Sequence, residues 1–402
     1  MATEHRSAPL SGVRVLDLTN VLAGPFACHQ LAYLGAEVIK VESVGQGDLA
    51  RNLGADPALS AKGMGISFLA QNAGKASLTL NLKTRRGKEA LERLVKTADV
   101  LVENFRPGVM DRLGLGYETL QAIRPELIYC AISGFGQTGP WADRPAYDQI
   151  VQGVAGVMSI TGDDQSAPLR VGYPLADTVG GLTAAMTINA ALNADPRGTF
   201  IDVSMLESVL ATMGWVLSNY LVGDVDPHPH GNENPTSAPS GAFQCADGLV
   251  NIAANKDAQW VLLARHLGRD DLLDAAAFAT REDRKANRLR LKAELETVLT
   301  TRSARDWARE LNEIGVPSGP VLSVPEILAH PQITGRDFVV RFDAVAGLDR
   351  AVDLASVGAL LDGVRPTVGT PPPVLSQDSN RLLTELGYSI DEIRQMKAEG
   401  AT

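Results

Sequence analysis

The stretch GVRVLDLTNVLAGPFACHQLAYLGAEVIKVE, residues 12–42, decides the fold class because it contains three elements in close succession. Residues 12–20 alternate and are rich in Val and Leu, a pattern typical of a strand. Residues 23–35 predict a helix, since Pro25 suits a first helical turn and a glycine stands where the helix should stop. The apolar segment 36–42 predicts a second strand. The stretch therefore reads as a strand–helix–strand unit with a short crossover.

The same alternation continues toward the C-terminus. A strand is predicted over residues 76–82, a helix over 84–98 and another strand over 99–104. Further strands are predicted over 127–132 and 199–204, with helical segments between them. Buried strands that alternate with helices are typical of a parallel sheet covered on both faces. We therefore expect an α/β fold with a Rossmann-like large domain.

Changes in amino-acid composition along the chain indicate the domain organisation. Residues 223–241 are the part of the chain richest in Pro, Gly and Asn, which is typical of a linker. A hairpin is predicted over 242–254, with an Asp-Gly turn at its centre. We expect a large α/β domain that begins with residues 1–224, a small inserted α+β domain over 225–320, and a return segment, 321–402, that completes the large domain.

Composition and charge exclude several classes of function. The chain has 402 residues, 45% of them hydrophobic, and a formal net charge of −10 at pH 7. Since it contains no basic tract, we expect no nucleic-acid partner. No apolar stretch is long enough to span a bilayer and no signal peptide is recognisable, so we expect a cytoplasmic protein without a membrane partner. Cys28, Cys130 and Cys245 lie far apart, which argues against a disulfide frame or a metal cluster.

The segment SGFGQTGPWADRPAYD, residues 133–148, contains the spacing Gly-x-Gly-x-x-Gly after a predicted strand. In a dinucleotide-binding loop a helix opens at the third glycine, and its N-terminus faces the pyrophosphate. Here Pro140 and Pro145 follow, and the residue before a proline is pushed out of the helical region. No acidic residue ends a strand about twenty residues further on, where a ribose partner would lie. An NAD site is therefore not favoured.

The segment PLADTVGG, residues 174–181, places Asp177 at the start of an apolar helical pattern. Judged by residue type alone, an aspartate here is expected to be the N-cap of the helix. A carboxylate nucleophile is compatible with the same place, because a helix N-terminus stabilises an anion and offers backbone donors to an oxyanion. With a reference pKa of about 3.9, the side chain is expected to be ionised at neutral pH. Gly180 and Gly181 predict a close approach of a ligand or of another backbone.

Several segments in the first half of the chain share their sequence and order with one enzyme family. They are PLSGVRVLDLTNVLAGPFACHQLAYLGAEVIKVE, GKASLTLNLKT, ADVLVENFRPGVMDRLGLGYETL, ISGFGQTGPWADRPAYD, PLADTVGG and GTFIDVSMLESVL. On these segments the chain resembles the family III CoA-transferases, the superfamily of formyl-CoA transferase, carnitine CoA-transferase and alpha-methylacyl-CoA racemase. The resemblance implies an interlocked homodimer that moves CoA from an acyl-CoA, with succinyl-CoA as the expected donor, to a carboxylic acid. It also makes Asp177 the nucleophile, through an aspartyl mixed anhydride and an aspartyl-CoA thioester.

The family's contacts with CoA and substrate carry over to matching positions. The resemblance implies such contacts for Val21, Ala23, Leu80, Lys83, Asn104, Phe105, Arg112, Tyr147 and Asp148. Lys83 and Arg112 would meet the CoA phosphates, or else they are ordinary surface charges. Asp148 is either a supporting acid or a helix-start residue. Leu22 replaces a glutamine of formyl-CoA transferase and Ser43 an arginine, which, with the missing glycine-rich lid, argues against formyl-CoA and oxalate. No metal and no cofactor beyond the CoA thioester are implied.

Three other functions are weighed against transfer. A racemase of the same superfamily would remove and return an alpha proton, which needs two acid–base groups beside one carbon. The racemase histidine falls at Tyr147, and a tyrosine, with a reference pKa of about 10, suits that exchange poorly. An oxidoreductase would use the glycine segment 133–148 and carry bound NAD. A CoA-binding protein without activity would not need Asp177. We favour the transferase.

Overall fold

The computed structural model describes residues 8–402, and these residues form two compact units. The large unit comprises residues 8–157, Arg170–Asp224 and Thr334–Thr402, and the small unit comprises Met158–Leu169 and Val225–Ile333. The domain limits expected from the sequence, with breaks after residues 224 and 320, stay a prediction. Within residues 8–402, no helix combines the length and the apolar character that crossing a membrane requires.

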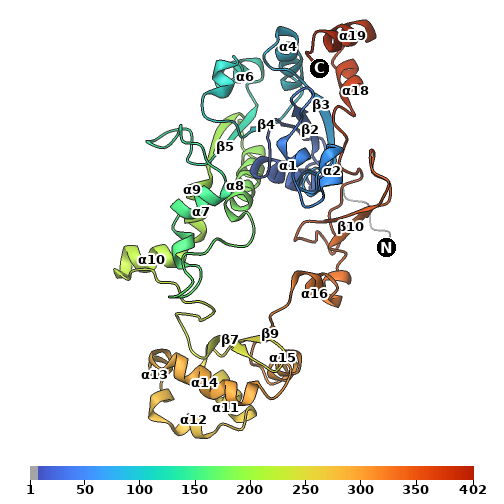
Figure 1. Ribbon diagram of the computed structural model, residues 1–402. Coiled ribbons are helices and arrows are strands. Elements are labelled where there is room, and N and C mark those ends of the chain that lie inside the picture. Colours follow the sequence, from blue (N-terminus) through green and yellow to red (C-terminus); the bar gives the residue numbers. More distant parts are fainter. Residues whose placement is uncertain (1–7) are drawn as a thin grey trace. The chain divides into compact units, whose positions relative to one another are not determined.

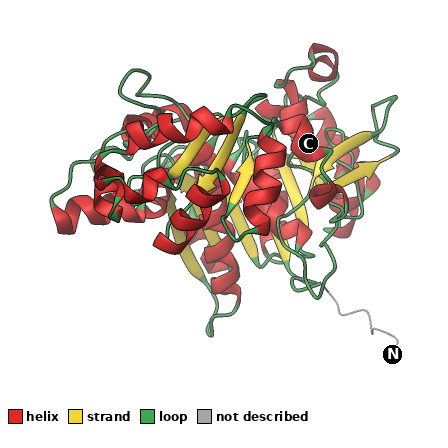
Figure 2. Cartoon of the chain, turned by 90° about the horizontal axis from the view of Figure 1, so that it is seen from below, coloured by secondary structure: helices red, strands yellow, loops and turns green. Residues whose placement is uncertain are grey.

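The large unit is built on a six-stranded sheet in which every neighbouring pair of strands is parallel. The strands are β1 (Arg14–Asp17), β2 (Glu37–Glu42), β3 (Lys75–Thr79), β4 (Val100–Glu103), β5 (Ile128–Ser133) and β6 (Thr199–Ser204). Their spatial order is β3-β2-β1-β4-β5-β6. Helices lie on both sides of these strands (Figure 2), which suits strands that are apolar along most of their length. The parallel α/β sheet expected from the sequence is confirmed.

The strands bury side chains on both faces of the sheet, because successive residues of a strand point to opposite sides. On one face, Leu16, Leu101 and Tyr129 belong to a buried cluster that also contains side chains of five helices. These helices are α4 (Arg85–Val95), α5 (Val109–Arg112), α6 (Tyr117–Ile123), α18 (Ser379–Glu385) and α19 (Ile390–Ala398). Figure 1 shows α18 and α19, at the red end of the chain, beside the blue α4. Two helices that pack against each other, α1 (Ala23–Tyr33) and α8 (Leu175–Leu192), cover the other face.

The remaining elements of the large unit are short. They are η1 (Leu49–Asn52), α2 (Pro57–Ala61), α3 (Ile66–Leu69), α7 (Asp148–Val154), α9 (Met205–Thr212), α10 (Gly214–Gly223) and the antiparallel pair β10 (Val339–Phe342) and β11 (Val352–Ala355). The sequence predicts one helix over residues 205–222, but the structure has two. The break falls at Met213, directly before Gly214, and glycine is a poor helix former.

The small unit combines a three-stranded antiparallel sheet with helices around a core of its own. The strands are β7 (Ser240–Gln244), β8 (Leu249–Ala253) and β9 (Ser318–Pro320). The helices are α11 (Asp257–His266), α12 (Asp271–Asp274), η3 (Ala276–Phe278), α13 (Arg281–Ala286), α14 (Arg288–Leu299), α15 (Ala304–Glu313) and α16 (Val324–Leu328), while η2 (Val157–Ile160) and α17 (Pro331–Thr334) cross the limits of the unit along the chain. The predicted hairpin over 242–254 is confirmed, whereas β9 lies where the sequence suggests only a proline-rich crossing.

Candidate active site

Asp177 is the third residue of α8 and lies within its first turn. The N-cap is Pro174, whose side chain accepts no hydrogen bond, and the amide of Ala176 donates instead to Oδ1 of Asp148 at 2.8 Å. The expectation that Asp177 is the N-cap is therefore wrong, because a carboxylate from α7 has that role. The Asp177 carboxylate makes no hydrogen bond or ion pair with any residue between 8 and 402.

Asp148 opens α7 and is buried, with 7% of its surface exposed. Its Oδ2 accepts hydrogen bonds from Nε2 of Gln152 at 2.8 Å and from the guanidinium of Arg170 at 2.9 Å. With the Ala176 amide on Oδ1, these donors occupy both carboxylate oxygens and compensate for the loss of water. Asp148 is thus a helix-start residue, and its charge also acts on Asp177.

The pKa of Asp177 is far from its ordinary value. Burial raises the pKa and the negative charge of Asp148 raises it further, while Arg170 lowers it, and the result is about 7. The first turn of a helix by itself favours a carboxylate, so burial and like charge outweigh the helix dipole here. The expectation that Asp177 is fully ionised at neutral pH is corrected accordingly. An anion that the protein solvates this poorly is well suited to attack an electrophile.

Two glycines let the start of α8 pack closely against its neighbours. A Cβ at Gly181 would lie 2.6 Å from the carbonyl oxygen of Ala23, the first residue of α1. A Cβ at Gly180 would lie 2.9 Å from a side-chain carbon of Met205. The close approach predicted at these glycines is therefore to the protein itself. Since residues four apart share a helix face, Asp177 lies on the face of α8 that is turned toward the start of α1.

The turn between β1 and α1 lies at the carboxyl edge of the sheet and has free backbone donors. In the described part of the chain, the amides of Ala23 and Gly24 have no acceptor, and the N-cap side chain is apolar. Val21 has a φ of 66°, a left-handed conformation that costs a β-branched residue about 1–3 kcal/mol. Asn104, which follows β4, exchanges two hydrogen bonds of 2.8 Å with the backbone of Asn20. Three positions implied to contact CoA thus meet at this turn.

The other positions implied to contact CoA differ in burial. Leu80 is buried in the core cluster on the α4 face and Phe105 packs against it, so the Leu80 side chain is closed to a ligand. Lys83 and Arg112 are exposed and make no ion pair with any described residue. Both cations follow the carboxyl ends of strands, Lys83 after β3 and Arg112 after β4. They are therefore available to an anionic ligand at this edge of the sheet.

The glycine segment after β5 forms a returning loop. Gly136 and Gly139 have φ of 87° and 91°, and the described chain contains no helix between this segment and α7. A Cβ at Gly134 would lie 2.3 Å from the Cβ of Ala146. The absence of a side chain at Gly134 therefore allows Ala146, near the end of the loop, to pack against the end of β5. The loop thereby carries Tyr147, which is 67% exposed, and the first residue of α7 to the start of α8. This geometry does not present a helix N-terminus to a dinucleotide.

Comparison with known proteins decides the family. Residues 10–379 match the family described as CoA-transferase family III. The chain belongs to this family. It is 36% identical to succinate–glutarate CoA-transferase of Agrobacterium fabrum, over 95% of this chain and 96% of that protein. It is 41% identical to acetyl-CoA:oxalate CoA-transferase of Acetobacter aceti, over 84% of this chain and 87% of that protein. The crystal structure of a CAIB/BAIF family protein from Brucella suis matches with a TM-score of 0.82 and 34% identity, over 95% of this chain and 100% of that chain.

Membership of CoA-transferase family III confirms the resemblance seen in the sequence. The protein is an enzyme of this family, and CoA transfer is its activity. Because these relatives are named as transferases, racemisation is not favoured. Their names include succinate with glutarate in one case and acetyl-CoA with oxalate in another, so membership alone leaves the choice of acids open.

Four residues around the site of this family III CoA-transferase are not identified from the sequence. They are Lys40, Asp48, Gln152 and Arg170. Lys40 interrupts an apolar strand, where a buried ammonium needs a partner, and Asp48 precedes a short helical turn as an N-cap does. Those two signals are present in the sequence. Gln152 and Arg170 carry none, because only the folded chain brings them to Asp148.

Proposed function

We propose that this enzyme moves CoA from an acyl-CoA donor to a carboxylic acid through covalent intermediates on Asp177. The carboxylate attacks the thioester carbonyl carbon, the carbon–sulfur bond breaks, and CoA leaves as a thiolate. The product is a mixed anhydride of Asp177 and the donor acyl group. The thiolate then attacks the Asp177 carbonyl carbon, which releases the donor acid as a carboxylate and leaves an aspartyl-CoA thioester.

The acceptor acid takes these steps in reverse. Its carboxylate attacks the aspartyl-CoA thioester, which forms a second mixed anhydride and releases the CoA thiolate. The thiolate attacks the acyl carbon of the acceptor, so the acceptor acyl-CoA forms and the Asp177 carboxylate is restored. Each step exchanges a carbon–sulfur bond and a carbon–oxygen bond. The cycle therefore needs no oxidant, no net proton and no energy source beyond the donor thioester.

The state of Asp177 is the observation that carries the proposal. A side chain kept only to cap α8 would bond to the amides of its first turn, and Asp148 does this instead. Asp177 has no partner, its pKa is raised to about 7, and it lies on the face of α8 toward the start of α1. The free amides of Ala23 and Gly24 are suitable donors to a developing oxyanion.

The remaining roles in the proposal concern CoA itself. Lys83 and Arg112 bind its phosphates as charge-assisted donors. The turn at Val21 and the residues Asn104 and Phe105 form the wall along which CoA lies, and Tyr147 lies beside the thioester. Leu80, whose side chain is buried, can meet CoA only through its backbone. These roles come from the resemblance, and the free cations and the open α1 start agree with them.

Succinyl-CoA is the proposed donor, and a dicarboxylic acid longer than oxalate is the proposed acceptor. Relatives named for succinate with glutarate and for succinyl-CoA with mesaconate support this choice. Because another relative is named for acetyl-CoA and oxalate, oxalate is the alternative acceptor with which the proposed acceptor must be compared. Leu22 and Ser43, which replace a glutamine and an arginine of formyl-CoA transferase, argue against formyl-CoA and oxalate.

A panel of substrates tests this proposal. Succinyl-CoA and acetyl-CoA are each incubated with glutarate, mesaconate and oxalate, and the acyl-CoA products are resolved by mass spectrometry. Succinyl-CoA with glutarate or mesaconate is expected to give the new acyl-CoA, and Asp177→Asn is expected to give none. If wild-type enzyme that binds acyl-CoA transferred to no acid, or if Asp177→Asn kept its rate, the proposal would be wrong.

A homodimer completes the proposal. Three helices of the large unit, α7, α8 and α10, expose large apolar side chains. These are Ile150, Val154, Leu182, Met186, Trp215, Leu221 and Val222. Exposed apolar surface of this kind is typical of an interaction surface. The resemblance supplies the partner, a second copy of this chain interlocked with the first.

A further inference from the structure

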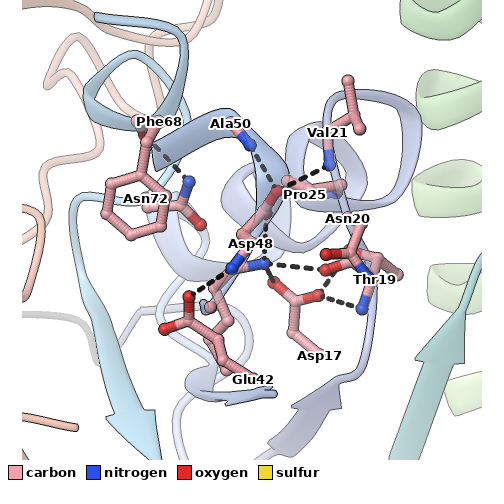
Figure 3. Close-up of polar contacts among 12 residues, drawn as sticks. Asp17, Thr19, Asn20, Val21, Pro25, Glu42, Asp48, Ala50, Phe68 and Asn72 are labelled. Carbon is pink, nitrogen blue, oxygen red and sulfur yellow. Dashed lines mark hydrogen bonds and ion pairs between the residues drawn. The ribbon is translucent and has the colours of Figure 1, made fainter. Parts of the chain in front are cut away.

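Fully buried charges lie beside the turn between β1 and α1. Nζ of Lys40 lies 2.9 Å from Oδ2 of Asp48, and neither side chain has any exposed surface. Asp17, at the end of β1, lies 3.9 Å from Lys40 and 2.8 Å from Lys75. Figure 3 shows Asp17 and Asp48 gathered next to the turn. Because burying ions is costly even when they are paired, a group of this kind needs an explanation beyond stability.

The Lys40–Asp48 pair holds the backbone of the turn from two sides. Nζ of Lys40 donates to the carbonyl oxygen of Thr19 at 2.9 Å. Oδ1 of Asp48 accepts from the amide of Val21 at 2.9 Å and from the amide of Ala50, in η1, at 2.9 Å (Figure 3). The ion pair joins these two attachments. The path of the chain from Thr19 to Val21 is thus fixed by side chains from β2 and from the start of η1, together with Asn104, which bonds to the backbone of Asn20.

Val21 is the residue for which this restraint matters most. Its φ of 66° lies in the left-handed region, which a β-branched side chain disfavours. The hydrogen bond from the Val21 amide to Asp48 stabilises this left-handed conformation. α1 begins two residues later, and the free amides of Ala23 and Gly24 are its first donors. If Val21 relaxed to an ordinary conformation, the turn would change direction and these donors would move away from Asp177.

We infer that Asp48, itself held by Lys40, is a positioning residue of the transfer reaction: it maintains the left-handed Val21 and so aims the first turn of α1 at the acyl-CoA. The inference rests on the proposed function, because it takes acyl-CoA as the ligand at that turn. Asp48 is not a catalytic residue. Its carboxylate is buried, Oδ1 accepts two backbone hydrogen bonds, and Oδ2 forms the ion pair with Lys40.

A neighbouring ion pair provides a matched control. Arg51 lies 2.7 Å from Glu42, and both side chains are buried. The other side-chain hydrogen bonds of Arg51 go to the carbonyl oxygens of Gly63 and Pro373 and to the sulfur of Met64, not to the turn. Arg51→Ala therefore removes a buried ion pair of η1 and leaves in place Glu42, which accepts from the Asp48 amide, and the bond from the Val21 amide to Asp48. A merely structural role for Asp48 predicts the same kinetic result for both changes.

Steady-state kinetics with varied succinyl-CoA test the inference. Asp48→Ala is expected to raise the KM for acyl-CoA at least about tenfold and to change the KM for the acceptor acid less than about twofold. Asp48→Asn keeps an acceptor for both amides and should stay within about threefold of wild type. Arg51→Ala should lower the melting temperature and leave the acyl-CoA KM within about twofold. An unchanged KM in Asp48→Ala, or an equal rise in Arg51→Ala, overturns the inference.

A double-mutant cycle isolates the link to Val21. Glycine adopts the left-handed conformation without a steric penalty, so Val21→Gly removes the need for a restraint. In that background, Asp48→Ala should raise the acyl-CoA KM by less than about a third of its effect beside Val21. Equal effects in both backgrounds would overturn the inference. If Asp48→Ala did not fold, Asp48→Ser would take its place, because serine still caps η1 but is too short to serve both amides.

For Asp48→Ser the acyl-CoA KM should rise at least about fivefold, and an unchanged KM overturns the inference. Failure of the proposed function is distinguishable, because it shows in the wild type as absent acyl-CoA binding and absent transfer. Failure of the inference shows as normal transfer by the wild type together with an unchanged KM in the Asp48 variants.

Discussion

As the proposed nucleophile, Asp177 needs both weak solvation of its carboxylate and the ability to lose its proton, and these two requirements oppose each other. A carboxylate that attacks a thioester should be poorly solvated, because strong hydrogen bonds would stabilise it before the reaction. It must also be able to lose its proton. Burial and Asp148 act against ionisation while Arg170 favours it, and the balance leaves a pKa of about 7. At neutral pH a substantial fraction of the enzyme therefore holds a reactive anion.

Asp177→Asn is expected to raise the melting temperature at pH 8 and to leave it unchanged at about pH 4. The folded protein keeps the Asp177 proton up to about pH 7, whereas the unfolded chain releases it at about pH 3.9. Between these values the unfolded state binds fewer protons, so wild-type stability falls as pH rises, and the loss persists above pH 7. Asparagine carries no charge and avoids that loss. Calorimetry at both pH values measures the difference.

The exposed aspartate Asp391 provides the control for this measurement. Asp391→Asn removes a carboxylate from the surface of α19 and should give no gain that appears only at high pH. If Asp177→Asn melted below wild type at pH 8, the carboxylate would be stabilising in the folded protein. Burial and the charge of Asp148 would then not dominate its surroundings.

Arg112→Ala is expected to weaken CoA binding by about 1–2 kcal/mol, or roughly five- to thirtyfold, because it removes one charge-assisted contact with a phosphate. The affinity for the acceptor acid should change little, since we propose that Arg112 contacts only the CoA phosphates. Titration calorimetry with CoA measures the loss. Arg394→Ala, which removes an exposed arginine paired with Asp391 on α19, is the control and should leave CoA affinity unchanged. Unchanged affinity in Arg112→Ala would withdraw its assignment to the phosphates.

Among the secondary-structure elements, the strands of the sheet are predicted well because most of them are short segments rich in apolar residues between turn residues. The strand over 199–204 has the predicted limits, and the helix over 23–35 ends at Tyr33. β9 is missed because Ser318–Pro320 has neither alternation nor length, and it exists only by pairing with β8. A strand that depends on its neighbour for its definition leaves little trace in its own residues.

The candidate site was predictable in part for a related reason. Asp177 stands in a recognisable segment, so the sequence places it at a helix start. Its environment could not be predicted, because Asp148 and Arg170 meet it only in the folded chain. The wrong N-cap assignment has the same origin: the cap of α8 comes from another helix.

Gly181→Ala tests the packing of α8 on α1. The new Cβ would lie 2.6 Å from the Ala23 carbonyl oxygen and 2.9 Å from the Phe26 ring, so the helices must separate. We expect a loss of about 1–3 kcal/mol in the free energy of unfolding and a lower rate of transfer, because Asp177 moves with α8. Denaturant unfolding and an activity assay measure both effects.

Gly214→Ala is the matched control for this substitution. It adds the same methyl group to a helix, but nothing lies within 4 Å of its Cβ. Alanine is the better helix former, so this variant should be as stable as wild type or more so. If Gly181→Ala behaved like Gly214→Ala in both assays, close contact between α8 and α1 would not be needed to place Asp177.

At the scale of the whole molecule, we expect a mass of twice the 42.7 kDa of one chain in light scattering at micromolar concentration. Met186 and Trp215 are 68% and 81% exposed in the isolated chain, and association would bury them. Met186→Glu should weaken the dimer, because a charge would enter an apolar interface. Ile390→Glu, at an exposed position of α19, should leave the mass unchanged. A monomeric wild type would contradict the proposed dimer.

We propose that Asp177 becomes covalently bonded during transfer, and detection of that bond tests the proposal directly. Wild-type enzyme is mixed with succinyl-CoA in heavy water without an acceptor, quenched, and analysed by intact mass and peptide mapping after trapping with hydroxylamine or borohydride. We expect an acyl or CoA adduct, or its trapped product, on the peptide that contains Asp177. We expect no such adduct in Asp177→Asn and no deuterium at the alpha carbon of the acyl group. Alpha deuterium without an adduct, or transfer by an enzyme that never carries an adduct at Asp177, would show that Asp177 is not the nucleophile.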